Sequence, residues 1–141
     1  MLVFFDSSAF AKRYVQEAGS DDVLLWGERA SEIGLSGIAL PEIISAFCRL
    51  SREKRISRKQ YHSLKVSLLE DVRDAVICNL SPEVIRHSII ALEKSTLRGM
   101  DAIHIGSALA LHAEVFVSAD QRQCHAAKLA GKLAGLQVVK V

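Results

Sequence analysis

Short apolar runs alternate along the chain with longer segments in which apolar side chains recur every three or four residues. A continuous apolar run is typical of a buried strand, and a period near 3.6 residues is typical of a helix with one face in a core. The runs predict strands over residues 2–5, 33–36, 75–78, 115–117 and 136–139. The periodic segments predict helices over residues 7–16, 20–30, 41–54, 57–74, 82–94, 100–112 and 121–133.

Strands that alternate with single or paired helices favour a parallel sheet covered on both faces. The 141 residues contain no internal repeat and no linker rich in proline or glycine, so we expect a single domain over 1–141. The two prolines, Pro41 and Pro82, both stand near predicted helix starts, where proline is well tolerated.

The composition is that of an ordinary globular protein: 50% of the residues are apolar and 24% are charged. The formal net charge of +2 does not by itself indicate nucleic-acid binding. The three cysteines form no C-x-x-C pair, and their odd number favours a reducing, cytoplasmic environment with the thiols packed in the core. No apolar run reaches the ~18 residues of a membrane helix, and a signal peptide is not expected.

Four carboxylates stand where apolar segments end or helices begin. Asp6 and Asp120 each follow a predicted strand directly, while Glu42 and Asp101 lie near the starts of two predicted helices. Ligands of open parallel sheets bind outside the carboxyl ends of the strands, so these residues are expected to meet at one edge. Each acid alone is equally explained as a helix cap or as a first-turn acid that favours the helix dipole.

Four like charges in one pocket repel each other unless a cation joins them, and a set of oxygen ligands suits Mg²⁺ or Mn²⁺. This favours metal-assisted hydrolysis of phosphodiesters as a hypothesis. Asp6, Asp101 and Asp120 are the expected metal ligands, and Glu42 either binds the metal or orients a water beside it. The Ser8 hydroxyl is expected to support the site. Ser8 also argues against a haloacid-dehalogenase-type phosphatase, which needs a second Asp at that position.

Four segments together resemble the PIN-domain family of ribonucleases and, within it, the small VapC-type toxins. The resemblance covers essentially the whole chain and rests on the stretches 4–9 (FFDSSA), 40–43 (LPEI), 98–105 (RGMDAIHI) and 116–120 (FVSAD). It implies a three-layer α/β/α sandwich with a parallel five-stranded sheet and a Mg²⁺- or Mn²⁺-dependent endoribonuclease. It also implies an acidic metal site at Asp6, Glu42, Asp101 and Asp120, with Ser118 as the hydroxyl residue before the last acid.

The same resemblance implies frequent homodimers and inhibition by a cognate antitoxin, which makes the toxin of a toxin–antitoxin pair the expected role. In one respect the chain departs from the family. Some members carry a further acid or Asn just after the last Asp, whereas here Gln121, Arg122 and Gln123 follow. The departure predicts fewer bound metals, or a weakly held second one.

A basic stretch between residues 49 and 65 contains one acid, Glu53. It is expected either to follow RNA phosphates or to be a solvated helical hairpin. The candidate RNA contacts are Arg49, Arg52, Arg55 and Arg58.

His104 lies one helix turn after Asp101 and is expected to be a packed helix residue, because no zinc-binding pattern accompanies it. Two further functions stay open. One is a PIN-fold module that binds RNA or protein without effective catalysis, and the other is a hydrolase of small phosphate esters.

Overall fold

Five parallel strands form one sheet in the order β3-β2-β1-β4-β5 in the computed structural model, which describes residues 1–141. The sheet has the parallel pairing that short buried runs separated by helices favour. The strands are β1 (Leu2–Phe5), β2 (Glu32–Ser36), β3 (Val76–Cys78), β4 (Val115–Ser118) and β5 (Gln137–Lys140).

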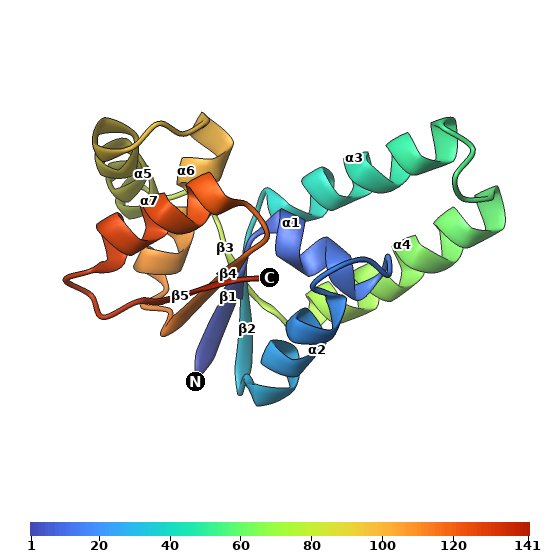
Figure 1. The fold of residues 1–141 in the computed structure, drawn as a ribbon, viewed down its shortest axis with the longest axis horizontal. Helices are drawn as coiled ribbons and strands as arrows, with labels where there is room; N and C mark the ends of the chain where they lie inside the picture. The colour runs from blue at the N-terminus through green and yellow to red at the C-terminus, as the bar shows by residue number, and fades with distance from the viewer.

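Helices cover both faces of the sheet, as Figure 1 shows. One layer holds α1 (Ser7–Phe10), the 3₁₀ turn η1 (Ala11–Arg13), α2 (Ser20–Arg29), α3 (Ala39–Arg52) and α4 (Arg58–Arg73). The other layer holds α5 (Pro82–Lys94), α6 (Gly99–Ala110) and α7 (Gln121–Gly131). The expected three-layer α/β/α sandwich is therefore confirmed. No helix has both the length and the apolar character needed to cross a bilayer.

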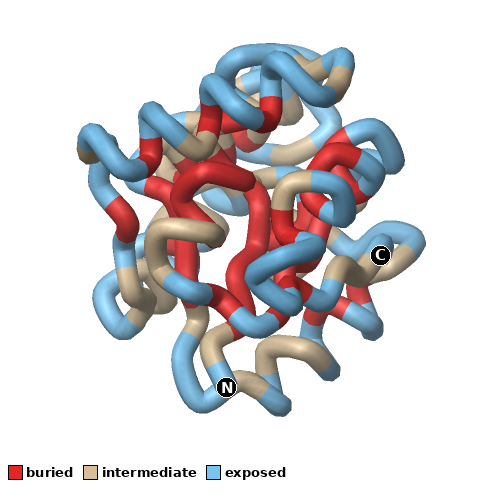
Figure 2. The backbone as a smooth tube through the Cα atoms, turned by 90° about the vertical axis from the view of Figure 1, so that its left-hand side faces the viewer, coloured by how far each residue is buried: buried red, intermediate tan, exposed pale blue.

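The alternation of side chains along the strands divides the core into two halves. Val3 and Phe5 of β1 pack toward α1–α4, whereas Phe4 between them packs toward α5–α7. β4 repeats the pattern, with Phe116 stacked on Phe4 at a ring-centroid distance of 5.8 Å. The buried segments accordingly run through the middle of the molecule, as Figure 2 shows.

Most helix boundaries differ from those expected by one or two residues, and differences at the first and third predicted helices have a physical reason. The helix predicted over 7–16 stops as a regular helix at Phe10 and continues only as the turn η1. Tyr14 ends this turn because its hydroxyl donates to Asp71 Oδ2 of α4 at 2.6 Å, which turns the chain away. The helix predicted from Pro41 starts at Ala39, and Pro41 lies in the first turn, where no backbone N–H partner is required.

The strand order places a topological switch point between β1 and β4. These strands are neighbours in register, with Phe5 opposite Val117, although more than a hundred residues separate them. The connections from β1 lead to β2 and β3 on one side, while β4 and β5 lie on the other. Ligands of open α/β sheets bind at such a point, beyond the carboxyl ends of the strands. Asp6 and Asp120 follow those two ends.

Candidate active site

Asp6 stands directly after β1 and also caps α1, accepting a hydrogen bond from the Ala9 amide at 2.8 Å. Its side chain is buried, with 1% of its surface exposed. Ser8 Oγ donates to the carboxylate at 2.8 and 2.9 Å, and Ser118 Oγ from β4 donates at 2.5 Å. Burial raises the pKa of Asp6, while these three donors act in the opposite direction. The two serines singled out in the sequence thus hold the buried carboxylate in place.

Asp120 and Asp101 lie across the cavity on the α6–α7 side. Asp120 caps α7 by accepting from the Gln123 amide at 2.9 Å, and its side chain is exposed. Asp101 lies in the first turn of α6, whose cap position is Arg98, and its carboxylate accepts no hydrogen bond from the protein. Burial and then the neighbouring charge of Asp120 raise the pKa of Asp101. Helix capping therefore explains Asp120 in part but does not explain Asp101.

Glu42 is held on the other wall by two side chains. Ser7 Oγ donates to Glu42 Oε1 at 2.7 Å, and His104 Nε2 lies 2.5 Å from the same oxygen. Burial raises the pKa of Glu42, but hydrogen bonds from His104 and Ser7 and the charge of His104 outweigh it, so the pKa lies below its ordinary value. The Ser7 hydroxyl donates its single proton to Glu42, so in the 3.2 Å contact between His104 Nε2 and Ser7 Oγ the donor is Nε2.

The sequence-based prediction missed three residues of the site, Ser7, Arg98 and His104. For His104 the cause of the omission can be identified. The expectation of a packed helix residue was right about burial, since only 2% of its surface is exposed, but it overlooked the contact with Glu42. Its other ring nitrogen, Nδ1, is buried without a hydrogen-bond partner. The signal in the sequence was the three-residue spacing from Asp101, which puts both side chains on one face of α6.

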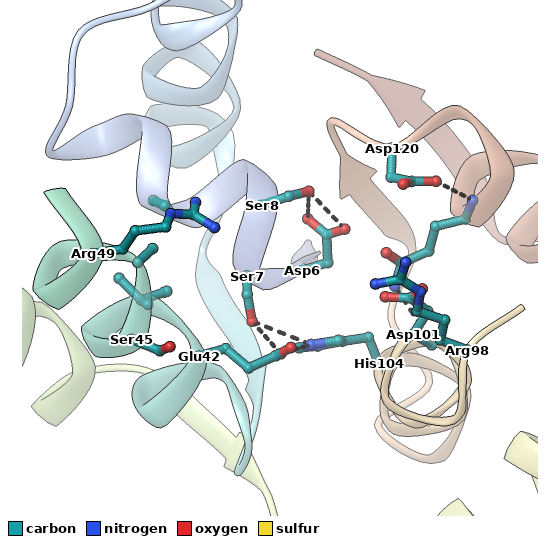
Figure 3. Close-up of a pocket in the computed structure, with 14 residues that line it drawn as sticks. Asp6, Ser7, Ser8, Glu42, Ser45, Arg49, Arg98, Asp101, His104 and Asp120 are labelled. Carbon is teal, nitrogen blue, oxygen red and sulfur yellow. Dashed lines mark hydrogen bonds and ion pairs between the residues drawn. The ribbon is translucent and has the colours of Figure 1, made fainter. Parts of the chain in front are cut away.

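The four acids line a single cavity of about 460 Å³ at the carboxyl edge of the sheet, shown in Figure 3. They come from four segments: the end of β1, the first turns of α3 and α6, and the loop after β4. Arg49 and Arg98 also line the cavity. Two basic groups therefore stand among four carboxylates, an arrangement that can bind both a cation and the anionic phosphate it would accompany.

Carboxylate and hydroxyl oxygens are the donors that Mg²⁺ and Mn²⁺ prefer, so the chemistry of this set fits such an ion. The raised pKa values of Asp6 and Asp101 indicate that a nearby cation would relieve desolvation and crowded charge. As the side chains are placed, no three acidic, histidine or cysteine groups lie close enough together to hold an ion. Mg²⁺ usually keeps several waters and needs only one or two carboxylates. Among the four acids Asp101 is the one that no hydrogen bond restrains, so it can turn toward a bound ion.

Of the four arginines proposed to contact RNA, only Arg49 lines the cavity. It lies on α3 two turns beyond Glu42 and hence on the same helix face. Arg52, Arg55 and Arg58 lie farther along the α3–α4 hairpin, which projects away from the sheet in Figure 1. Arg55 forms an exposed ion pair with Glu53 at 3.8 Å. The basic run is therefore split between the site and the hairpin tip.

Comparison with known proteins agrees with this geometry. Ribonuclease VapC45 of Mycobacterium tuberculosis is 28% identical over 110 residues, which are 78% of this chain and 76% of the relative. A toxin–antitoxin complex from Klebsiella pneumoniae contains a chain with a TM-score of 0.68 and 14% identity, covering 98% of this chain and 96% of that one. The structure of FitAcB from Neisseria gonorrhoeae contains a chain with a TM-score of 0.69 and 12% identity, and the match covers 98% of this chain and 96% of that one.

The model of the PIN domain matches residues 3–129, a span that contains all four acids of the cavity. The resemblance noted in the sequence is thereby confirmed, and the chain belongs to the PIN domain family.

Proposed function

We propose that this protein is a Mg²⁺- or Mn²⁺-dependent endoribonuclease that hydrolyses RNA phosphodiester bonds. The observation that carries the proposal is the meeting of Asp6, Glu42, Asp101 and Asp120 in one cavity at the switch point of the sheet. Membership of the PIN domain family and the name of the relative, a ribonuclease, support the choice of substrate.

Asp6, Asp101 and Asp120 would hold the cation, which supplies a Lewis acid for the phosphate and lowers the pKa of water. Asp6 is fixed beforehand by its three donors, so it gives the site a rigid anchor. Asp101 is free to turn toward it. Arg49 and Arg98 would bind the phosphate oxygens on which charge develops.

Glu42 would orient the attacking water. Ser7 and His104 both engage Oε1, and this leaves Oε2 without a protein partner. The depressed pKa keeps the carboxylate ionised, so it can accept a hydrogen bond from water. The water oxygen then forms a bond to phosphorus as the bond to the leaving oxygen breaks, and the proton lost by this water passes through Glu42 Oε2 to solvent. No side chain in the cavity is placed as a separate acid, so the leaving oxygen takes its proton from solvent water.

The proposal includes a role as the toxin of a toxin–antitoxin pair, with a cognate antitoxin as partner and a homodimer as the working form. Several solved structures with this fold come from toxin–antitoxin complexes, including the one from Klebsiella pneumoniae. Any small reading frame adjacent to the gene is the candidate antitoxin, and co-expression with it tests the pairing. A stable complex with suppressed RNA cleavage is expected, and sedimentation of the free protein gives its oligomeric state.

The decisive experiment is cleavage of end-labelled RNA with Mg²⁺ or Mn²⁺, with and without a chelator. Cleavage is expected only with metal, and Asp6→Asn and Asp101→Asn are each expected to abolish it. Both variants should keep the wild-type circular dichroism spectrum. Tight RNA binding with no cleavage in Mn²⁺ would favour the non-catalytic module instead. Turnover of a chromogenic phosphomonoester without RNA cleavage would favour the small-ester hydrolase.

A further inference from the structure

A row of adjoining cavities leads from the acidic site along the start of α7. The acidic cavity shares Arg98, Asp101 and Asp120 with a second cavity of about 570 Å³. The second shares Gln121 and Arg122 with a third of about 510 Å³. The third shares Gln121 and His125 with a fourth of about 310 Å³. The last three all have Gln121 in their lining, and together we call them the α7 trough.

The charge of this trough changes along its length. Asp101 and Asp120 line its first part, beside the acidic site, and no carboxylate lines the rest. All its basic side chains are exposed. None of them forms an ion pair with a carboxylate. The basic side chains are Lys94, Arg98, Arg122, His125, Lys128 and Lys140.

Unpaired basic groups in a row are suited to a polyanion rather than to a single small anion. Arg122 and Lys128 lie six residues apart on α7, which is roughly 9 Å along a helix axis. The side chains of Thr96 and Gln121 in the trough can also donate hydrogen bonds to phosphate oxygens. No Phe, Tyr or Trp lines the trough, so base stacking on such a ring is not part of the fit.

The α3–α4 hairpin does not offer such a row of unpaired basic groups beside the acidic site. Arg52, Arg55 and Arg58 line neither the acidic cavity nor the trough. Arg55 is also paired with Glu53. A strand whose scissile phosphate lies between the four acids would thus meet basic groups continuously on the α7 side, but only Arg49 before the hairpin turns away.

We propose that the α7 trough binds the sugar–phosphate backbone of RNA on one side of the cleaved bond. The inference rests on the proposed function and adds the path of the substrate to it. Contacts of this kind position a strand without selecting its sequence. The trough therefore contributes affinity that is the same for different RNA sequences and that decreases with salt.

The test compares two variants that each remove two exposed positive charges from helices. Arg122→Ala/Lys128→Ala alters the trough, and Arg52→Ala/Arg58→Ala alters the hairpin. Binding of a fluorescein-labelled RNA 12-mer is measured by anisotropy in EDTA at several salt concentrations, with two unrelated sequences. The trough variant is expected to lose at least tenfold in affinity for both sequences. Its log–log salt slope should fall by about 1.4, the value for two phosphate contacts to a single strand. The hairpin variant should bind like the wild type.

Equal losses of RNA affinity in the two variants would mean that only the total charge matters, and this would overturn the proposed role of the trough. Unchanged RNA affinity of the trough variant would also overturn it. Polyglutamate of equal charge is added as a competitor. If it displaces the labelled RNA as effectively as unlabelled RNA does, the surface would be assigned to an acidic polypeptide instead. The outcomes separate from those of the proposed function. RNA cleavage by a trough variant with wild-type affinity refutes only the trough, and salt-dependent binding in the trough without metal-dependent cleavage refutes only the nuclease.

Discussion

At the scale of single residues, the acids of this site fall into two groups with opposite protonation behaviour. Burial raises the pKa of Asp6 and of Asp101, and the charge of Asp120 adds to the effect at Asp101. At Glu42 burial acts in the same direction, but the donors His104 and Ser7 reverse it. Carboxylates that share one cavity therefore differ in whether their charge opposes or supports the folded state.

The first group yields a prediction about stability without metal. The pKa of Asp101 is higher in the folded than in the unfolded protein, so its ionisation destabilises the fold as pH rises above the ordinary value of 3.8. Asp101→Asn is therefore expected to unfold at higher urea concentration than the wild type at pH 7 in EDTA. The difference should vanish below the ordinary pKa. A variant less stable than the wild type at pH 7 would contradict the argument.

Glu42→Gln gives the matched control with the opposite sign. The folded pKa of Glu42 lies below its ordinary value of 4.5, so its stabilising contribution is present above that value and is lost as pH falls through the folded pKa. Glu42→Gln is expected to be less stable than the wild type at pH 7, and the deficit should close in acid.

His104 leads to a prediction about catalysis. Its Nε2 holds Glu42 at 2.5 Å, so we expect it to act as a positioning residue rather than to touch substrate. His104→Leu, which keeps the bulk but removes the donor, should lower kcat by about 10- to 100-fold, the range for residues that orient active-site ligands. His104→Gln, which restores a donor at similar reach, should recover part of the loss.

A double-variant cycle separates positioning from packing. If His104 acts through Glu42, adding His104→Leu to Glu42→Gln should lower kcat little further than Glu42→Gln alone. Fully additive losses in kcat would mean that His104 contributes only to the core, where its ring lies edge-on to Phe4.

At the scale of elements, the packing of α5 against α6 fixes half of the site. Gly106 of α6 lies so close to α5 that an added Cβ would stand 2.6 Å from the Val84 carbonyl oxygen. Any larger residue must push the two helices apart. Since α6 carries both Asp101 and His104, its position relative to β1 and α3 determines whether the acids meet.

Gly106→Ala is therefore expected to destabilise the protein by about 1–3 kcal/mol, the usual effect of overpacking. Cleavage should decrease as well, measured at a temperature where the variant remains folded. Gly99→Ala is the control, because a Cβ at that position in the same helix meets no atom within 4 Å. Destabilisation by Gly99→Ala as large as by Gly106→Ala would show that helix contact is not the cause.

Local signals predicted most of these elements, all four acids of the cavity and the supporting Ser8, while Ser118 was expected only from the family resemblance. β1 and β4 are apolar runs followed by an acid, so the sequence indicated both the strand and the candidate metal ligand after it. The early end of the first helix was not visible, because it depends on the contact between Tyr14 and Asp71 of α4. The role of His104 likewise depends on Glu42, sixty-two residues away. The clustered arginines correctly indicated a basic segment. They did not indicate that the α3–α4 hairpin projects away from the cavity, because its direction depends on tertiary packing.

At the scale of the whole molecule, the cavity joins both helical layers and the middle of the sheet. Its acids come from the end of β1 in the sheet, from α3 on one face, from α6 on the other, and from the loop after β4. A ligand held by all of them is bound only by the folded state. Its binding free energy must therefore add to the stability of the entire fold.

Mn²⁺ at a hundred times its dissociation constant is expected to stabilise the wild type by about 2.7 kcal/mol, seen as a higher Tm in calorimetry. The shift should be much smaller for Asp101→Asn. It should be unchanged for Glu70→Gln, which removes an exposed acid of α4 outside the cavity. The same Mn²⁺-dependent shift in wild type and Asp101→Asn would place the ion elsewhere.

The pairing of β1 with β4 also has a consequence for the order of synthesis. The hydrogen bond from Ser118 to Asp6 joins residues 112 positions apart, and Asp120 comes later still. While the ribosome is making the first hundred residues, β1 has only its partner β2 and the acid site lacks one wall. A growing chain can therefore hold no complete catalytic centre until residue 120 has emerged. Under the proposed function, a nascent copy therefore cannot cleave the message that encodes it during most of its own translation.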